Sequence, residues 1–267
     1  MKIIVPIDFS TNSIKALELA ISLSKKDDTQ INLIHIIELI YDFASQAAVA
    51  LDSMHKESKK LLKELESKYS QTGIKFDHII QEGTASISIA RIAEENEASL
   101  IVMGTKGASG LKKAFFGSTT VNLLQETNCP VLVVPEPVQI KHLQRLTLAL
   151  EFADHEPKSI EKLIDLSESW KLNLELLHIQ TSGGFREELA YLGLEKYISA
   201  KFPDKSVRYH TYFGESAQEG LDAFLEEHHH MILAMCHHHR NLMESIFKKS
   251  HSIEMAYHTE VPLLIIL

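Results

Sequence analysis

Residues 103–120, MGTKGASGLKKAFFGSTT, carry three spaced glycines followed by hydroxyl side chains, in the pattern G-x₂-G-x₉-G-S-T. Glycine lets backbone amides approach an oxyanion with no Cβ in the way, and hydroxyl groups add hydrogen-bond donors. This combination of residue types is suited to holding the phosphates of a nucleotide. The residues of the pattern are Gly104, Gly107, Gly117, Ser118 and Thr119.

Two familiar phosphate-binding motifs do not fit this stretch. The pattern G-x-x-x-x-G-K-[ST] fails because five residues separate Gly104 from Gly110 and Leu111 follows. The pattern G-x-G-x-x-G fails because Thr105 stands where its first glycine should be. The alternative to a phosphate cradle is a pair of turns with Ser118 as a helix N-cap.

The surrounding pattern places the glycines between a strand and a helix. Residues 100–103 form a short apolar run, and residues 115–126 have helical spacing. Gly104 therefore follows the carboxyl end of a strand, where open α/β sheets bind ligands. Gly117 falls near the start of a helix, whose amides point at a bound anion. The position of the motif favours a phosphate cradle.

Apolar runs and helical patterns alternate through the first half, as in a parallel sheet covered on both faces. The second half repeats this order. IIVPIDF and INLIHI match LTLALEF and LELLHI at an offset of 143 residues, whereas CPVLVV matches VPLLII at an offset of 132. The difference between the two offsets means that the second half is eleven residues shorter than the first. We expect most of these residues to be missing after the second strand. There, residues 38–53 have no full counterpart and are either a lid over the adenine side or a disordered loop.

Repetition at this length predicts two similar domains, with a boundary near PEPVQIK at residues 135–141. We expect one domain at residues 1–138, with the intact motif, and a degenerate copy at residues 139–267. The final strands of the two halves are expected to pair, so that the chain forms an internal pseudo-dimer. A homodimer is a further alternative.

The glycine motif, an Asp closing the first strand and CPVLVVP at the end of the first half together resemble the universal stress protein family. The resemblance covers the whole chain as a tandem pair. It implies an α/β fold of two five-stranded parallel sandwich domains, Rossmann-like and of the adenine-nucleotide alpha hydrolase type. It also implies a stress-response role and binding of ATP, with or without Mg²⁺, by the domain that carries the motif.

Site residues follow from the resemblance by position. Pro6 and Asp8 would lie near the adenosine, with Asp8 accepting a hydrogen bond from the ribose or approaching a metal. Ile36 would hold adenine through its backbone. The residues implied to wrap the ribose and phosphates are Met103, Gly104, Gly107, Gly117, Ser118 and Thr119. Nearby lysines are expected to be solvated; they are Lys106, Lys112 and Lys113.

The second copy has lost the glycines. At the offset of 132, Cys236, His239 and Lys249 stand at the three glycine positions, and at the offset of 143 Glu151 stands where Asp8 is. Side chains at these positions fill the space that a triphosphate needs, and Cys or His tolerates a positive φ poorly. The C-terminal half is therefore predicted not to bind ATP in the family manner and to serve as a structural or regulatory partner.

The histidines invite a metal hypothesis. The clusters 228–230 and 237–239 flank MILAMC, and a strand of that length separates them by roughly 20 Å, which excludes one mononuclear site. Cys236, His237 and His239 are the candidate ligands of a zinc site. Consecutive residues seldom all face one ion, so the pattern favours a His-rich polar loop and no metal.

No catalytic set can be assembled from the sequence, because Asp8 is a single carboxylate and no Ser-His-Asp arrangement is evident. An ATP-binding stress protein is the leading hypothesis. A slow ATP hydrolase and a protein-interaction scaffold that needs no ligand are the alternatives.

Composition narrows the class of protein and its setting. The formal charge is −9 with no basic stripe, which argues against nucleic acid as a partner. Two cysteines are too few for a disulfide framework. No signal-peptide core or membrane-spanning apolar run is evident. We therefore expect a cytoplasmic protein that does not associate with membranes.

Overall fold

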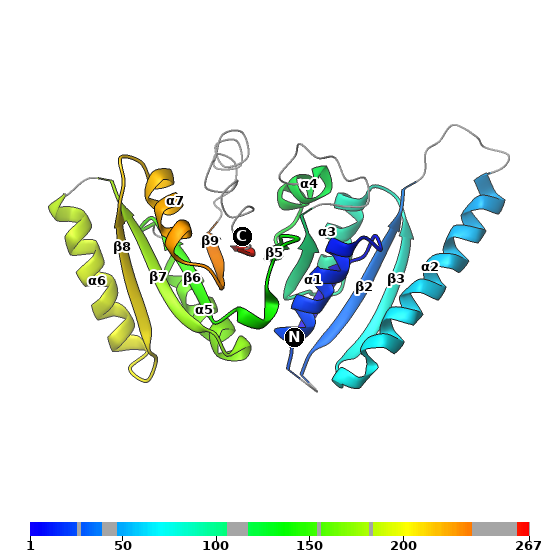
Figure 1. Ribbon diagram of the computed structural model, residues 1–267, viewed down its shortest axis with the longest axis horizontal. Helices are drawn as coiled ribbons and strands as arrows, with labels where there is room; N and C mark the ends of the chain where they lie inside the picture. The colour runs from blue at the N-terminus through cyan, green and yellow to red at the C-terminus, as the bar shows by residue number, and fades with distance from the viewer. Residues whose placement is uncertain are drawn as a thin grey trace. The chain divides into compact units, whose positions relative to one another are not determined.

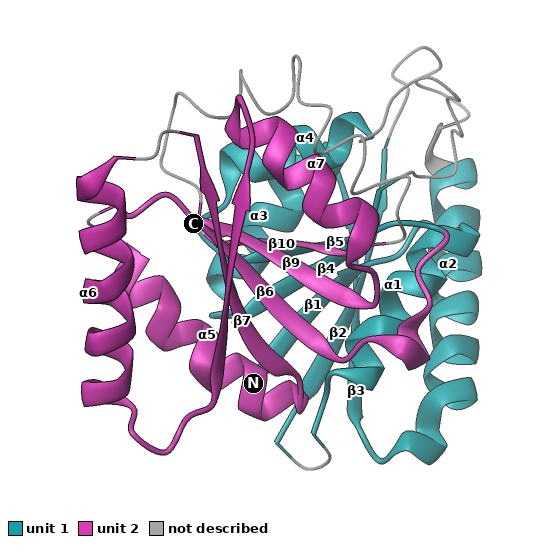
Figure 2. Cartoon of the chain, turned by 60° about the vertical axis from the view of Figure 1, so that its left-hand side comes forward, with its two compact units in different colours: residues 1–136 teal, residues 137–267 magenta. Residues whose placement is uncertain are grey.

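The computed structural model describes residues 1–25, 28–38, 47–105, 117–153, 156–181, 184–236 and 261–266. The chain divides into two compact units, Met1–Glu136 (unit 1) and Pro137–Leu267 (unit 2), which are coloured separately in Figure 2. Each unit alternates strands and helices along the chain (Figure 1). The predicted α/β fold class is confirmed.

Unit 1 is built on a parallel sheet with the strand order β3-β2-β1-β4-β5. Its strands are β1 (Lys2–Pro6), β2 (Gln30–Ile37), β3 (Lys75–Glu82), β4 (Leu100–Gly104) and β5 (Val131–Val134). Its helices are α1 (Thr11–Ser22), α2 (Ala47–Tyr69), the short 3₁₀ helix η1 (Ser70–Thr72), α3 (Ala85–Glu95) and α4 (Ser118–Glu126). Consecutive buried residues on β1, Ile3 to Val5, show that both faces of the sheet are covered.

Unit 2 repeats this arrangement with the strand order β10-β9-β6-β7-β8. Its strands are β6 (Arg145–Leu150), β7 (Asn173–Gln180), β8 (Val207–Phe213), β9 (Met231–Cys236) and β10 (Leu263–Ile266). Its helices are η2 (Ile140–His142), α5 (Glu156–Trp170), α6 (Phe185–Lys201) and α7 (Ala217–Glu227). The strands β6, β7, β9 and β10 thus take the places of β1, β2, β4 and β5.

The eleven-residue loss lies where the sequence places it. The second strands of the two units start at residues 30 and 173, an offset of 143, whereas the third strands start at residues 75 and 207, an offset of 132. All eleven residues are therefore lost between the second and third strands. The connection holds a 23-residue helix in unit 1 and a 17-residue helix in unit 2.

The first turns of α2 account for part of the segment whose role was left open. Residues 47–53 belong to this helix, whose first residues include three alanines and a leucine, which are good helix formers. Residues 39–46 lie outside the described part of the chain. Residues 47–53 of the segment are therefore regular helix.

Candidate functional site

The strand order of unit 1 reverses direction between β1 and β4. From β1 the chain moves outward to β2 and β3 and then returns to the other side of β1 with β4 and β5. The two neighbours pair in parallel, with Ile3 opposite Leu100 and Ile4 opposite Ile101. The carboxyl ends of strands at such a reversal border a crevice in which open α/β sheets bind ligands. Pro6 and Gly104, two of the predicted site residues, end these strands.

The turn after β1 holds the carboxylate of Asp8 in place. Asp8 Oδ1 accepts hydrogen bonds from the Ser10 amide at 3.0 Å and from the Ser10 hydroxyl at 2.5 Å. Ser10 is also the N-cap of α1, and its Oγ accepts from the Ser13 amide at 3.2 Å. Asp8 is half-buried. The start of α1 therefore orients Asp8, the carboxylate for which the family resemblance implies a place near the adenosine.

Ile36 lies inside β2, opposite Gln81 of β3. The Ile34 carbonyl oxygen accepts from the Ile7 amide at 2.7 Å, on the β1 side, and the Ile37 carbonyl oxygen accepts from the Gly83 amide at 3.1 Å, on the β3 side. Successive peptide groups of a strand point to opposite sides, so Ile36 directs its peptide groups toward β1. At that level β1 has already ended, and the backbone of Ile36 faces the space beyond it.

Gly104 ends β4 at a point of close approach to α1. A Cβ at this position would lie 2.9 Å from Asn12 Cγ and 3.1 Å from the Asn12 carbonyl carbon, so any side chain would force Asn12 to shift. Met103 precedes it with a buried side chain, 5% exposed, so only its backbone reaches the end of the strand. The requirement for glycine at residue 104 is therefore a packing requirement as well as a means of exposing backbone.

The helix α4 begins at the last glycine of the motif. Gly117 is its N-cap, with no side-chain cap, and its carbonyl oxygen accepts from the amides of Thr120 and Val121 at 3.0 and 3.2 Å. The amides of Ser118 and Thr119 therefore precede the first bonded turn and point out of the helix. The alternative of Ser118 as N-cap is wrong, since Ser118 is already helical. Gly107 and the three nearby lysines lie outside the described residues.

Unit 2 reproduces the first turn of unit 1. Phe9 and Phe152 both have positive φ, 62° and 59°, and each ring packs on a histidine of the second strand, His35 or His178, at 4.8 and 4.3 Å. Nδ1 of His35 lies 2.7 Å from the Ile7 carbonyl oxygen, and that of His178 lies 3.3 Å from the equivalent oxygen of residue 150. These histidines hold the turn by packing and hydrogen bonding.

The polar groups beyond this turn differ between the units. In unit 2 the carboxylate of Glu156, 4% exposed, accepts from the amides of Glu151 and Ala153 at 2.7 and 3.0 Å. Cys236 ends β9 at the position of Gly104. Burial raises the pKa of the Cys236 thiol, and the nearby charges of Glu156 and Glu151 raise it further. In unit 2 the carboxylate of Glu156 thus accepts the hydrogen bonds of the turn amides.

Cys236 was the described member of the candidate zinc ligands, and His237 and His239 lie outside the described residues. Across the described ranges, no three His, Cys, Asp or Glu side chains gather in a way that could hold a metal ion. A raised thiol pKa disfavours the thiolate that binds zinc. Every helix in the described part of the chain is too short or too polar to cross a lipid bilayer.

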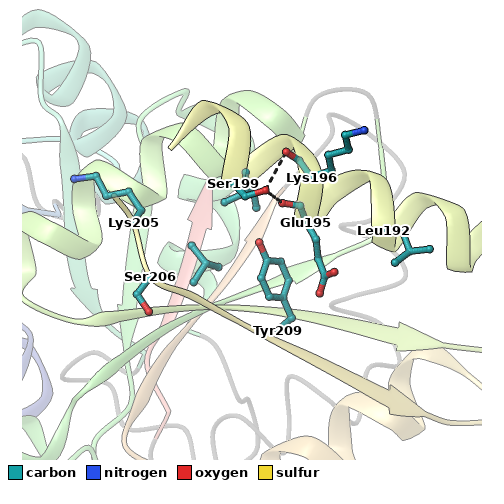
Figure 3. A pocket seen from close by; sticks show the side chains of 9 residues that line it. Leu192, Glu195, Lys196, Ser199, Lys205, Ser206 and Tyr209 are labelled. Atoms are coloured by element: carbon teal, nitrogen blue, oxygen red, sulfur yellow. Dashed lines mark hydrogen bonds between the residues drawn. The ribbon is translucent and has the colours of Figure 1, made fainter. Parts of the chain in front are cut away.

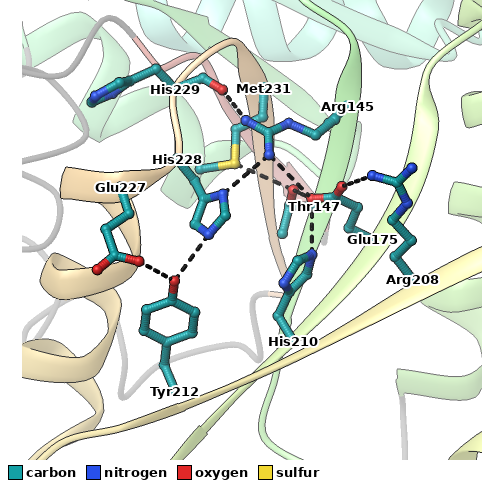
Figure 4. Close-up of polar contacts among 10 residues, drawn as sticks. All are labelled: Arg145, Thr147, Glu175, Arg208, His210, Tyr212, Glu227, His228, His229 and Met231. Carbon is teal, nitrogen blue, oxygen red and sulfur yellow. Dashed lines mark hydrogen bonds and ion pairs between the residues drawn. The ribbon is translucent and has the colours of Figure 1, made fainter.

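A buried charge cluster in unit 2 was not predicted from the sequence (Figure 4). Glu175 of β7 is fully buried, and its carboxylate lies 3.9 Å from Arg145, 3.9 Å from Arg208 and 3.3 Å from His210. Thr147 donates to it at 3.4 Å. The sequence held one signal for this cluster: the charged Glu175 lies between Leu174 and Leu176 in an otherwise apolar strand. The cluster lies near the amino ends of the strands, away from the carboxyl-end turn.

His228 at the end of α7 extends this cluster and is held neutral. Arg145 donates to its Nδ1 at 3.2 Å, and its Nε2 lies 3.0 Å from the Tyr212 hydroxyl, which donates to Glu227 at 2.6 Å. Burial, with the nearby charges of Arg145 and His210, lowers the pKa of His228. Burial and the hydrogen bond to Glu227 raise the pKa of Tyr212 to about 12.

We therefore expect unit 2 to lose stability in mild acid. The pKa of His228 is lower in the folded chain than the unfolded value of 6.5, so the unfolded chain binds the proton more readily. The contribution is fully present above about pH 6.5 and is lost as the pH falls from there through the folded-state pKa. Trp170, the single tryptophan of the chain, is buried in unit 2 and reports its unfolding by fluorescence.

The measurement compares urea unfolding of the wild type and His228→Gln between pH 8 and pH 5. Glutamine keeps an oxygen that accepts from Arg145 but does not titrate. As the pH is lowered, the urea concentration at the unfolding midpoint should fall more steeply for the wild type than for the variant. Parallel plots of midpoint against pH would mean that protonation of His228 is not linked to unfolding.

A pocket of about 620 Å³ lies between α6 and β8 (Figure 3). Two of its polar groups are engaged within the unit: the Ser199 hydroxyl donates to the carbonyl oxygens of Glu195 and Lys196, and Lys205 pairs with Glu168. Its polar groups do not converge on a ligand position. The carboxyl end of the unit 1 sheet is therefore the stronger candidate.

Comparison with known proteins agrees with the fold and with the family resemblance. The model of the universal stress protein family matches residues 1–135. A universal stress protein of Methanocaldococcus jannaschii is 31% identical over 140 residues, covering 51% of this chain and 82% of the relative. One from Bacillus subtilis is 31% identical over 144 residues, covering 50% and 97%. A solved universal stress protein from Archaeoglobus fulgidus shares the fold over 99% of this chain and 95% of its own, with a TM-score of 0.77 at 22% identity.

Proposed function

Because the chain belongs to the universal stress protein family, we propose that unit 1 binds an adenine nucleotide, ATP, and that the protein acts in a stress response. One observation carries the proposal. The uncapped start of α4 is held against the end of β4, because the Gly117 amide donates to the Thr105 carbonyl oxygen at 2.7 Å. Exposed backbone at a strand end and an open helix N-terminus together suit a chain of phosphates.

The adenosine end of the ligand is assigned to the other side of the crevice. Asp8, oriented by Ser10, accepts from the ribose, and the backbone of Ile36, directed past the end of β1, bonds to adenine. Pro6 borders this side at the end of β1. Acceptors and donors for the sugar and base thus lie apart from the donors for the phosphates, as an extended nucleotide requires.

Unit 2 is proposed to be a structural or regulatory partner that does not bind ATP in this manner. Glu156 already occupies the turn amides, and a second carboxylate, Glu151, stands in the place of Asp8. Cys236 ends β9 where Gly104 offers exposed backbone in unit 1, and its side chain fills that space. A cytoplasmic setting is part of the proposal, supported by the presence of only two cysteines, Cys129 and Cys236, too few for a disulfide framework.

Titration calorimetry of the wild-type chain with ATP tests the proposal, with and without Mg²⁺. We expect saturable binding with a stoichiometry of one nucleotide per chain. We also expect freshly purified protein to release ATP or another adenine nucleotide when it is denatured. A stoichiometry of two would overturn the assignment of unit 2. Absence of both heat and released nucleotide would overturn the proposed function and favour a ligand-independent scaffold.

A further inference from the structure

A buried polar pair joins the first turn of α1 to the residue that follows β4. Asn12, in the first turn of α1, donates from Nδ2 to the hydroxyl of Thr105 at 3.0 Å. Both side chains are enclosed, with exposures of 4% and 2%. The residues are 93 positions apart in the sequence. Buried hydrogen bonds between side chains are costly to leave incomplete, so this pair specifies how α1 meets the end of β4.

Thr105 is also the residue to which α4 is attached. Its carbonyl oxygen accepts from the Gly117 amide at 2.7 Å, and its own amide donates to the Val134 carbonyl oxygen of β5 at 3.2 Å. A Cβ on Gly117 would lie 3.3 Å from that Thr105 oxygen. The position of the helix N-cap is therefore set by the backbone of Thr105, and the side chain of Thr105 is set by Asn12.

The adenosine side does not depend on this pair. Asp8 is held by Ser10, and Ser10 by Ser13, through hydrogen bonds in which neither Asn12 nor Thr105 takes part. Loss of the Thr105 hydroxyl would release the end of β4 and the start of α4 and leave the local bonds of the first turn intact. The two sides of the site are thus held by separate sets of hydrogen bonds.

We propose that Asn12 and Thr105 are positioning residues that fix the start of α4 for the phosphate groups of the nucleotide, and that their hydrogen bond sets the preference for ATP over adenosine. This inference rests on the proposed function of unit 1. Neither residue needs to touch the ligand. At the matching positions of unit 2 the sequence has His155 and His237, so the pair is not repeated.

Thr105→Val tests the proposal, because valine keeps the branched shape and removes the hydroxyl. Calorimetry should show the dissociation constant for ATP rising about tenfold, the effect of losing one buried hydrogen bond, while that for adenosine changes less than threefold. Thr105→Ser keeps the hydroxyl and should restore the wild-type ratio of the two constants. Equal losses for ATP and adenosine, or no loss for either, would overturn the positioning role.

Thr127→Val is the matched control. Thr127 is the C-cap of α4, is 5% exposed, and accepts from the Cys129 amide at 3.0 Å through its hydroxyl. This variant loses a comparable buried hydrogen bond at the opposite end of the same helix. It should leave the ratio of ATP to adenosine affinity unchanged, even if its melting temperature falls as much as that of Thr105→Val. A changed ratio would show that the ratio follows helix stability and not the pair.

A double-mutant cycle tests whether Thr105 acts through its hydrogen bond with Asn12. If the two side chains act through one hydrogen bond, Asn12→Ala with Thr105→Val should weaken ATP binding no more than either single change. Additive losses would overturn the coupling. A wild-type chain that binds neither ATP nor adenosine overturns the proposed function and this inference together, whereas a wild-type chain that binds ATP and a variant with an unchanged ratio overturn only the inference.

Discussion

Gly117→Glu is expected to weaken ATP binding about 100-fold or more while leaving the fold intact. Gly117 has φ −61° and ψ 149°, an extended conformation that glutamate adopts without strain. Its added carboxylate would lie at the uncapped start of α4, where the helix dipole favours one negative charge. The side chain would therefore occupy the position proposed for a phosphate and repel the remaining ones. A loss of 100-fold corresponds to about 2.7 kcal/mol.

Gly117→Gln is the control for size, because it has the same shape without the charge. Its added Cβ faces the Thr105 carbonyl oxygen at 3.3 Å, a tight contact that both variants share. We expect the glutamine variant to retain more ATP affinity than the glutamate variant, and adenosine to bind both alike. Circular dichroism and thermal unfolding establish that both variants fold. ATP affinity within threefold of the wild type in Gly117→Glu would contradict the assignment of the phosphate site.

Glu156→Ala is expected to destabilise unit 2 by about 2–4 kcal/mol. The carboxylate of Glu156 satisfies the amides of Glu151 and Ala153, and alanine would leave both without this acceptor in a partly enclosed turn. Each hydrogen bond to a charged group contributes roughly 1.5–3 kcal/mol, and relaxation toward water recovers part of the loss. Urea unfolding followed by Trp170 fluorescence measures the change, because this indole reports on unit 2 alone.

Glu156→Gln removes the charge and one of the two acceptor oxygens, because the amides of Glu151 and Ala153 bond to different oxygens of the carboxylate. Glutamine keeps one acceptor oxygen and should lose about half as much stability as alanine. ATP affinity of unit 1 is expected to stay unchanged in both variants. An unfolding midpoint equal to that of the wild type in Glu156→Ala would show that the turn does not depend on this carboxylate.

Local patterns in the sequence were sufficient for the elements, the repeat and the start of α4. Apolar runs on the strands signal burial on both faces, and two constant offsets, 143 and 132, located the shortened connection between the second and third strands. The helical pattern of residues 115–126 placed Gly117 at the start of a helix or within it, and the structure makes Gly117 the N-cap of α4. These features depend on neighbours a few residues away, and so they can be read from one sequence. ATP binding and the roles of the individual site residues stay predictions.

The contacts that give the site its shape come from the packing of distant segments. Asn12 meets Thr105 across 93 residues, and Arg145 meets His228 across 83. Glu175 reads in the sequence as a polar interruption of a strand, and only the order of strands in the sheet surrounds it with cations. Such pairs form because burying the apolar faces of all the strands fixes which strands become neighbours. The burial that fixes the order of the strands involves the whole unit, so no short window of sequence predicts it.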